Sequence, residues 1–198
     1  MTWFLRRTLG PAFLLLVAMT VLTGGVYPAV VTAIAQVAFP SQANGSLLVV
    51  DGRTVGSSLI GQCFDRPTYL WGRPSAAGAT ASNPCGYDAS SSGGSNLGPA
   101  SRTLIDVVTK RVDALRAATG DAPVPVDLVT ASASGLDPEI STAAAEYQVA
   151  RIAKARGITT AAVRAAIARR MVMPLLGFLG EPRVNVLLVN LDLDGLLR

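Results

Sequence analysis

The stretch Leu9–Phe39, LGPAFLLLVAMTVLTGGVYPAVVTAIAQVAF, determines the architecture of this 198-residue chain. Arg6 and Arg7 precede it, and no charged residue follows them until Asp51. A hydrocarbon core about 30 Å thick is crossed by about 20 apolar residues in a helix. The stretch therefore predicts one transmembrane helix, and we assign residues 1–39 to a cytoplasmic tip and this helix.

The two arginines also predict the orientation of the helix. Positively charged residues beside a span stay preferentially in the cytoplasm, and Arg6 and Arg7 are the only charges close to the stretch. We therefore expect a single-pass protein of the cell membrane with a cytoplasmic N-terminus. Residues 40–198 then form an extracytoplasmic domain, which can meet external ions, protein partners and the lipid bilayer but no cytosolic metabolite.

A cleaved signal peptide is the main alternative for the same stretch. Ala33-Ile34-Ala35 has the small-x-small pattern of a cleavage site. The apolar core of a signal peptide, however, is about 7–15 residues long, and the run before this site is far longer. Gly24, Gly25 and Pro28 interrupt the run, and membrane helices tolerate such residues. We favour an uncleaved anchor.

The residue types of the chain exclude several functions. There is no histidine, which excludes Ser-His-Asp and Cys-His catalytic sites and zinc sites with histidine ligands. The net charge of +4 is scattered along the chain, without the basic stripe and aromatics of a nucleic-acid-binding protein. P-loop and dinucleotide-binding glycine motifs are also absent from the sequence. We expect no catalytic residue, no metal site, no tightly bound cofactor and no nucleic-acid partner.

The two cysteines suggest a disulfide. Cys63 and Cys85 lie 22 positions apart in the segment expected outside the membrane. In an oxidising compartment such a pair forms a disulfide more readily than it persists as free thiols. The alternative is two buried thiols.

The segment after the span predicts one α+β domain. Residues 47–50 and 54–60 flank Asp51-Gly52, a turn typical of a β-hairpin. Residues 65–99 are rich in glycine, serine, proline and asparagine but also contain aromatic residues, so we expect a long ordered loop. Irregular segments of this length are usually either functional or disordered. Apolar periodicity and capping residues then predict three helices, at 101–119, 141–156 and 159–170. β-branched and leucine residues predict a final strand at 184–193.

Several polar motifs could have a binding role. The run Ser92-Gly93-Gly94-Ser95-Asn96 could turn its backbone N–H groups toward an anion. Asp127 and Asp137 bracket a serine-rich loop and could coordinate a cation, although a cap of the turn or helix entered at Pro138 is the simpler role for Asp137. Asp192 and Asp194 end the predicted last strand, where solvated charge is the ordinary explanation.

Six blocks follow one another along the chain: PSQANGS at 40–46, GSSLIGQ at 56–62, RPSA at 73–76, SGGSNLGP at 92–99, VPVDLVTASASGLDP at 124–138 and GEPRVNVLL at 180–188. Together they strongly resemble the C subunit of the Kdp potassium-transporting P-type ATPase, and the similarity extends from the anchor to the last block. The chain departs from the family pattern at Glu139, where histidine is common, and in having Cys63 and Cys85.

The resemblance implies a non-catalytic accessory subunit of a high-affinity, ATP-driven potassium uptake complex. Its partners are then a potassium-conducting A subunit and an ATP-hydrolysing B subunit. The family's C subunit is described as a catalytic chaperone that raises the ATP affinity of the B subunit and supports assembly. Its Ser-Gly-Gly-Ser stretch is likened to the signature loop of ABC transporters. Carried over to this sequence, the candidate nucleotide contacts are Ser92, Gly93, Gly94, Ser95 and Asn96, with ATP reached through the B subunit.

The expected orientation conflicts with direct ATP contact, because ATP is cytosolic and residues 92–96 are expected outside. An inverted topology would remove the conflict. So would an indirect effect, since coupling across the membrane needs only different affinities for two pump conformations. The alternative function is an extracytoplasmic structural subunit over the potassium entrance, without nucleotide contact, in which Asp127, Asp137 or loop carbonyls face that entrance. A hydrolase that acts independently of the complex is a further alternative, but without histidine it would have to rely on carboxylates for catalysis.

Overall fold

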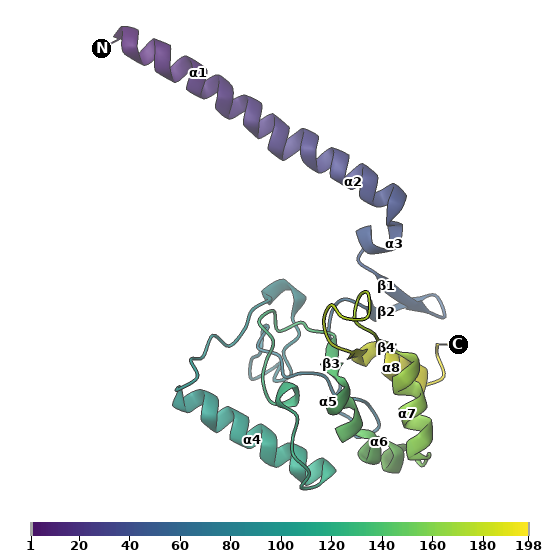
Figure 1. The fold of residues 1–198 in the computed structure, drawn as a ribbon. Helices are drawn as coiled ribbons and strands as arrows, with labels where there is room; N and C mark the ends of the chain where they lie inside the picture. Colours follow the sequence, from purple (N-terminus) through teal and green to yellow (C-terminus); the bar gives the residue numbers. More distant parts are fainter. Residues whose placement is uncertain (1, 198) are drawn as a thin grey trace. The chain divides into compact units, whose positions relative to one another are not determined.

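The computed structural model describes residues 2–197, with side chains from Arg7 onward. Met1, Arg198 and the side chain of Arg6, on which the predicted orientation partly depends, lie outside the described residues. The chain divides into two compact units, Met1–Leu47 and Leu48–Arg198, and Figure 1 follows the elements of each along the sequence.

The first unit is dominated by a long apolar helix. Helix α1 (Thr2–Val21) continues through a π-helical turn, η1 (Leu22–Val26), into α2 (Tyr27–Ala38). Residues 7–38 are long and apolar enough to cross a membrane, and none of this segment is buried within the protein. Phe39, which precedes Pro40, leaves the helical conformation, as sterically expected before proline, and Pro40 begins the short helix α3 (Pro40–Ala43). The predicted N-terminal helix is confirmed.

The second unit begins with the predicted hairpin. Strands β1 (Leu47–Val50) and β2 (Arg53–Ser57) form a two-stranded sheet. Asp51 and Gly52 connect them with φ angles of 49° and 74°, and a two-residue hairpin turn needs such positive values. The second strand ends at Ser57, three residues earlier than the predicted Ile60. A long irregular segment follows as expected, with one 3₁₀ turn, η2 (Ala89–Ser91).

A small sheet and four short helices form the centre of the second unit. Strands β3 (Glu139–Ser141), β4 (Met171–Val172) and β5 (Arg183–Asn185) pair antiparallel in the order β3-β5-β4, with Ile140 and Met171 both opposite Val184. The other elements are α4 (Arg102–Thr119), η3 (Val126–Leu128), α5 (Thr142–Tyr147), α6 (Val149–Arg156), α7 (Thr160–Arg169) and α8 (Val186–Leu193). The fold is α+β, as predicted.

One apolar core joins these elements. It includes Leu70 from the long loop, Ile140 and Val184 from the sheet, and side chains from α5 to α8. The fully buried larger apolar members are Leu70, Ile152, Val149, Val163, Val184 and Val189. The core therefore depends on a residue of the irregular segment as well as on regular elements.

Most of the predicted helix boundaries are confirmed by capping contacts. The side chain of Ser141 accepts a hydrogen bond from Ala144 N, and that of Thr159 accepts one from Ala162 N. Gly157 ends α6 in the left-handed conformation. The expected continuous helix over 141–156 is interrupted at Gln148, because its side-chain amide donates to the Ala144 carbonyl while its backbone N–H turns to Ala145.

The predicted final strand over 184–193 is wrong. Only Arg183–Asn185 form a strand, and residues 186–193 form helix α8. The Asn185 side chain accepts a hydrogen bond from Leu188 N and so caps the helix. The helix is apolar on nearly all sides because it is buried, and periodicity alone does not separate a buried helix from a buried strand.

Candidate functional site

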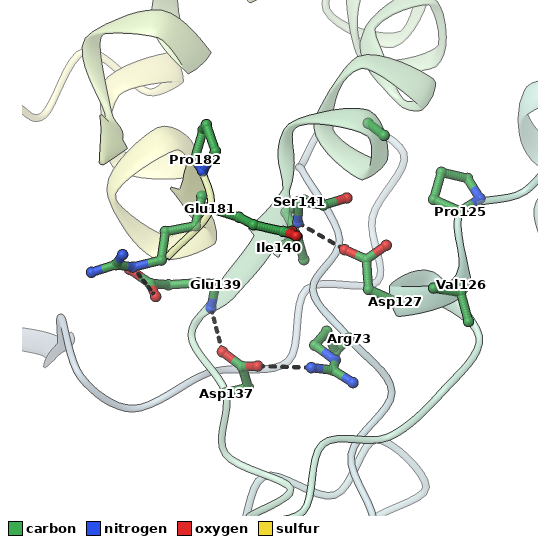
Figure 2. A pocket seen from close by; sticks show the side chains of 12 residues that line it. Arg73, Pro125, Val126, Asp127, Asp137, Glu139, Ile140, Ser141, Glu181 and Pro182 are labelled. Atoms are coloured by element: carbon green, nitrogen blue, oxygen red, sulfur yellow. Dashed lines mark hydrogen bonds and ion pairs between the residues drawn. The ribbon is translucent and has the colours of Figure 1, made fainter. Parts of the chain in front are cut away.

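The candidate site is an open groove of about 550 Å³ where β3, η3 and the segment leading into β5 meet (Figure 2). We call it the acidic groove, because four carboxylates and two guanidinium groups line it. The lining residues are Arg73, Pro125, Val126, Asp127, Asp137, Glu139, Ile140, Ser141, Ala143, Glu181, Pro182 and Arg183.

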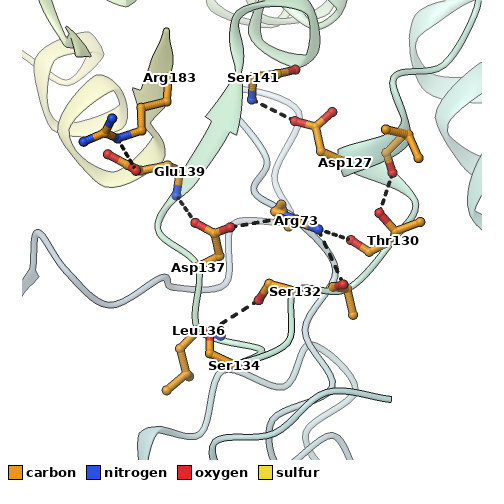
Figure 3. Close-up of polar contacts among 12 residues, drawn as sticks. Arg73, Asp127, Thr130, Ser132, Ser134, Leu136, Asp137, Glu139, Ser141 and Arg183 are labelled. Atoms are coloured by element: carbon orange, nitrogen blue, oxygen red, sulfur yellow. Dashed lines mark hydrogen bonds and ion pairs between the residues drawn. The ribbon is translucent and has the colours of Figure 1, made fainter. Parts of the chain in front are cut away.

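Asp137 lies on the wall of the groove and is bound on both of its oxygens (Figures 2 and 3). Its Oδ2 is 3.0 Å from Arg73 Nη1, and its Oδ1 accepts a hydrogen bond of 3.0 Å from Glu139 N. The side chain thus caps the turn through Pro138, and this turn enters strand β3 and not a helix. Of the two roles considered for Asp137, the structure shows the turn cap.

The other carboxylates of the groove differ in how far they are neutralised. Glu139 Oε2 pairs with Arg183 Nε at 2.6 Å, across β3 and β5. Asp127 Oδ2 accepts a hydrogen bond of 2.8 Å from Ser141 N, and no cation faces it among the ion pairs of the described residues. Glu181 also lines the groove. The two arginines neutralise Asp137 and Glu139. The groove is therefore negative overall, and its remaining negative charge comes from Asp127 and Glu181.

No metal cluster is present in the part of the chain that the structure describes. Groups of three or more histidine, cysteine, aspartate or glutamate side chains that could hold an ion do not occur there. The acidic groove can therefore attract cations through its charge, but its oxygens do not form a preorganised coordination shell.

The run Ser92–Asn96 packs against the serine-rich loop instead of opening into a cavity. Ser92 Oγ and Gly93 N both donate to the carbonyl oxygen of Ser134, at 3.0 and 2.9 Å. Gly94 lies close to the Ala133 carbonyl: a Cβ atom added at position 94 would be 3.1 Å from the Ala133 oxygen. One N–H group of the expected anion-binding run is thus already used inside the protein, while Ser95 and Asn96 are exposed.

The serine-rich loop is held tightly from the other side as well. Gly135 has a φ of +67°, and a Cβ there would lie 2.7 Å from both Ala77 N and Gly93 O. Ser75 Oγ donates to the Gly135 carbonyl at 2.6 Å. Three segments therefore meet at a position that only glycine fits. Figure 3 shows Arg73 between the backbone of the serine-rich loop, where it donates to the Thr130 carbonyl, and Asp137 on the wall of the groove.

Two buried amides position the segment that carries Arg73. Asn190 Oδ1 accepts from Leu70 N at 2.7 Å and its Nδ2 donates to Leu70 O at 2.9 Å. Gln148 does the same for the next residue: its Oε1 accepts from Trp71 N at 2.9 Å and its Nε2 donates to Trp71 O at 3.1 Å. We call Gln148 and Asn190 the amide clamp. They give an irregular segment the backbone partners that a neighbouring strand would provide.

A buried arginine completes the clamp. Arg151 donates to the carbonyls of Pro67 and Tyr69 and to Gln148 Oε1, and its guanidinium lies 3.7 Å from the centre of the Trp71 ring. Burial lowers the pKa of Arg151 to about 10. None of these three residues is predicted from the sequence as part of a site. The only available indication was a polar side chain within an otherwise apolar run, as for Asn190 between Val189 and Leu191.

Further contacts fix the long loop beside the groove. Cys63 and Cys85 are joined with their Cα atoms 5.9 Å apart. The Tyr87 hydroxyl donates to the Arg73 carbonyl, and burial raises the pKa of Tyr87 to about 12. The disulfide and Tyr87 thus both restrain the chain on either side of Arg73.

The two C-terminal aspartates are not simply solvated, which corrects the expectation for them. The Asp192 side chain is 7% exposed and lies 2.9 Å from Arg169 Nε and 3.5 Å from Arg170 Nε. Asp194 pairs with Arg156 at 2.7 Å and accepts the Tyr69 hydroxyl at 3.0 Å. Both residues therefore hold the end of α8 to neighbouring elements.

These features define an α+β protein that carries one N-terminal helix able to span a membrane. The model of the family "KdpC: K+-transporting ATPase, c chain" matches residues 9–195, and the chain belongs to this family. A protein of Sorangium cellulosum (strain So ce56) is 60% identical over 189 residues, which cover 94% of this chain and 97% of the relative. One of Polaromonas naphthalenivorans (strain CJ2) is 56% identical over 194 residues, covering 97% and 96%. Both relatives are called "Potassium-transporting ATPase KdpC subunit".

Proposed function

We propose that this chain is a non-catalytic accessory subunit of a potassium-transporting ATPase complex with a potassium-conducting A subunit and an ATP-hydrolysing B subunit. It raises the ATP affinity of the B subunit and supports assembly, without itself touching nucleotide. The observation that supports this role most directly is the family match over residues 9–195. The N-terminal helix supplies the membrane attachment that such a subunit needs.

The proposed mechanism is conformational coupling. A subunit that binds two pump conformations with different affinity shifts their populations, and this shift changes the apparent ATP affinity if the two conformations bind ATP differently. A tenfold increase in ATP affinity requires a difference of at least about 1.4 kcal/mol in how tightly this chain binds the two conformations. An interface of a few residues can supply such a difference.

Direct nucleotide contact by Ser92, Gly93, Gly94, Ser95 and Asn96 is the competing version of the same function. We disfavour it because Gly93 N and Ser92 Oγ are both bound to the Ser134 carbonyl, so an anion would have to displace these contacts. The predicted extracytoplasmic orientation also separates these residues from cytosolic ATP.

The acidic groove supports a second candidate function, that of a structural subunit over the potassium entrance. Asp127 and Glu181 leave the groove negative, and a negative surface raises the local concentration of cations. In this version the domain affects potassium access and leaves ATP affinity unchanged.

The test compares the complex purified with and without this chain. We expect removal of the chain to raise the half-saturating ATP concentration roughly tenfold, within the usual range of allosteric coupling. The double variant Ser95→Ala, Asn96→Ala should match the unmodified complex. An unchanged half-saturating ATP concentration after removal would overturn the proposal. Asp127→Asn combined with Glu181→Gln isolates the second candidate, because only that function predicts a weaker apparent potassium affinity for this variant.

A further inference from the structure

The loop between β4 and β5 exposes a concentrated set of apolar side chains. Residues 173–180, MPLLGFLG, contain no side chain that can donate a hydrogen bond, and no charge occurs between Arg170 and Glu181. We call this segment the apolar loop. Five of its side chains are more than half exposed: Met173 (64%), Leu175 (68%), Leu176 (75%), Phe178 (73%) and Leu179 (51%). Contiguous exposed apolar side chains of this kind mark an interaction surface.

The apolar loop is an ordered small hairpin and not a frayed connection. Leu175 and Leu179 exchange hydrogen bonds in both directions, at 3.1 and 3.0 Å. Gly177 N donates to Pro174 O at 3.0 Å and Phe178 N to Leu175 O at 3.3 Å. These backbone N–H groups are satisfied within the loop, so they can leave water without losing hydrogen bonds.

The conformation of Leu176 is unfavourable in itself. Its φ is +55°, in the left-handed region, where asparagine or glycine is accommodated more easily than leucine. The side chain is 75% exposed, so packing within the domain does not offset the strain. Transfer of this leucine into an apolar phase would offset it.

We propose that the apolar loop inserts into the interfacial region of the lipid bilayer. A bilayer needs no hydrogen-bond partners from an inserted segment, whereas a protein interface usually has about one hydrogen bond per 100–200 Å². The loop offers apolar side chains and four backbone N–H groups that are already hydrogen-bonded, those of Leu175, Gly177, Phe178 and Leu179, which suits lipid better than protein. This proposal does not depend on the proposed role in the ATPase complex.

A short connection ties the second unit to the apolar helix. Helix α2 ends at Ala38 and the first unit ends at Leu47, so nine residues, 39–47, connect the apolar helix to the second unit. An extended chain of nine residues reaches at most about 30 Å. The apolar loop therefore acts at the high local lipid concentration that a membrane anchor provides.

The experiment uses the full chain in lipid nanodiscs with brominated acyl chains, which quench tryptophan emission on contact. The probe is Phe178→Trp and the control is Ile105→Trp, at an exposed position on α4 (52%). Both are made in a Trp3→Phe background, and Trp71 contributes equally to both. We expect brominated lipid to reduce the added emission of the probe by about half or more, as for an interfacially inserted side chain, and to leave the control nearly unchanged.

Two results would overturn the proposal. One is equal quenching of probe and control, which would leave the loop in water. The other is a blue-shifted but unquenched probe, which would show that protein and not lipid covers the loop. Adding Leu176→Asn to the probe keeps the left-handed backbone and removes one apolar side chain, so we expect weaker quenching at an unchanged unfolding temperature. Quenching that does not weaken would also count against insertion.

Discussion

Replacing Asn190 with leucine tests the amide clamp directly. Asn190 is 1% exposed and binds both the N–H and the carbonyl of Leu70, which is itself fully buried. Leucine fills a similar volume but leaves both backbone groups without a partner. Each unsatisfied buried group costs about 1–3 kcal/mol, so we expect Asn190→Leu to lower the free energy of unfolding by about 2–6 kcal/mol.

The assay is urea unfolding of the full chain in detergent, in a Trp3→Phe background, followed by the fluorescence of Trp71. Asn96→Gly serves as the control, because Asn96 is exposed and has a φ of +52° that glycine adopts without strain. We expect this control to change stability by less than about 0.5 kcal/mol. A loss below about 1 kcal/mol for Asn190→Leu would refute the claim that the clamp replaces a strand partner for the segment leading to Arg73.

Three further predictions concern the contacts around the same segment. Cys63→Ser combined with Cys85→Ser should lower the free energy of unfolding by about 3 kcal/mol, and reductant should have this effect on the unmodified chain only. Burial raises the pKa of Tyr87 from its ordinary value of about 10 to about 12, so the neutral side chain stabilises the fold fully below about pH 10. Stability should therefore fall as the pH rises from about 10 to about 12, by up to about 2–3 kcal/mol, and Tyr87→Phe should show a smaller fall in the same pH series. Arg151→Lys should lower the free energy of unfolding in urea by about 2 kcal/mol, because lysine keeps the charge but loses the three hydrogen bonds of the guanidinium and its stacking on Trp71. An unchanged unfolding midpoint together with an unchanged Trp71 spectrum would contradict this.

The predictable parts of the fold are those that local residues determine. The absence of charge before Asp51 predicts the apolar helix, and Asp51-Gly52 predicts the hairpin because its conformation needs positive φ. Ser141 and Thr159 predict helix starts because each caps its own first turn. Helix α8 was mistaken for a strand because its sequence reflects burial, which long-range packing determines.

The candidate site depends on contacts between distant residues, which one sequence does not reveal. Asp127 and Asp137 were candidates from their spacing, but Glu139 and Glu181 reach the same groove only through the pairing of β3 with β5. Arg73 pairs with Asp137 across 64 positions, and Asn190 binds Leu70 across 120. No local pattern predicts such partners.

The orientation of the second unit tests the central claim, that this chain affects ATP affinity without contacting nucleotide. A protease site and a tag are added to the C-terminus of the full chain, and intact spheroplasts of a bacterial host are treated with the protease. We predict loss of the tag in intact spheroplasts, with a cytoplasmic marker protein preserved. A tag that stays protected until lysis would contradict it and would make Ser92–Asn96 the first target for nucleotide crosslinking.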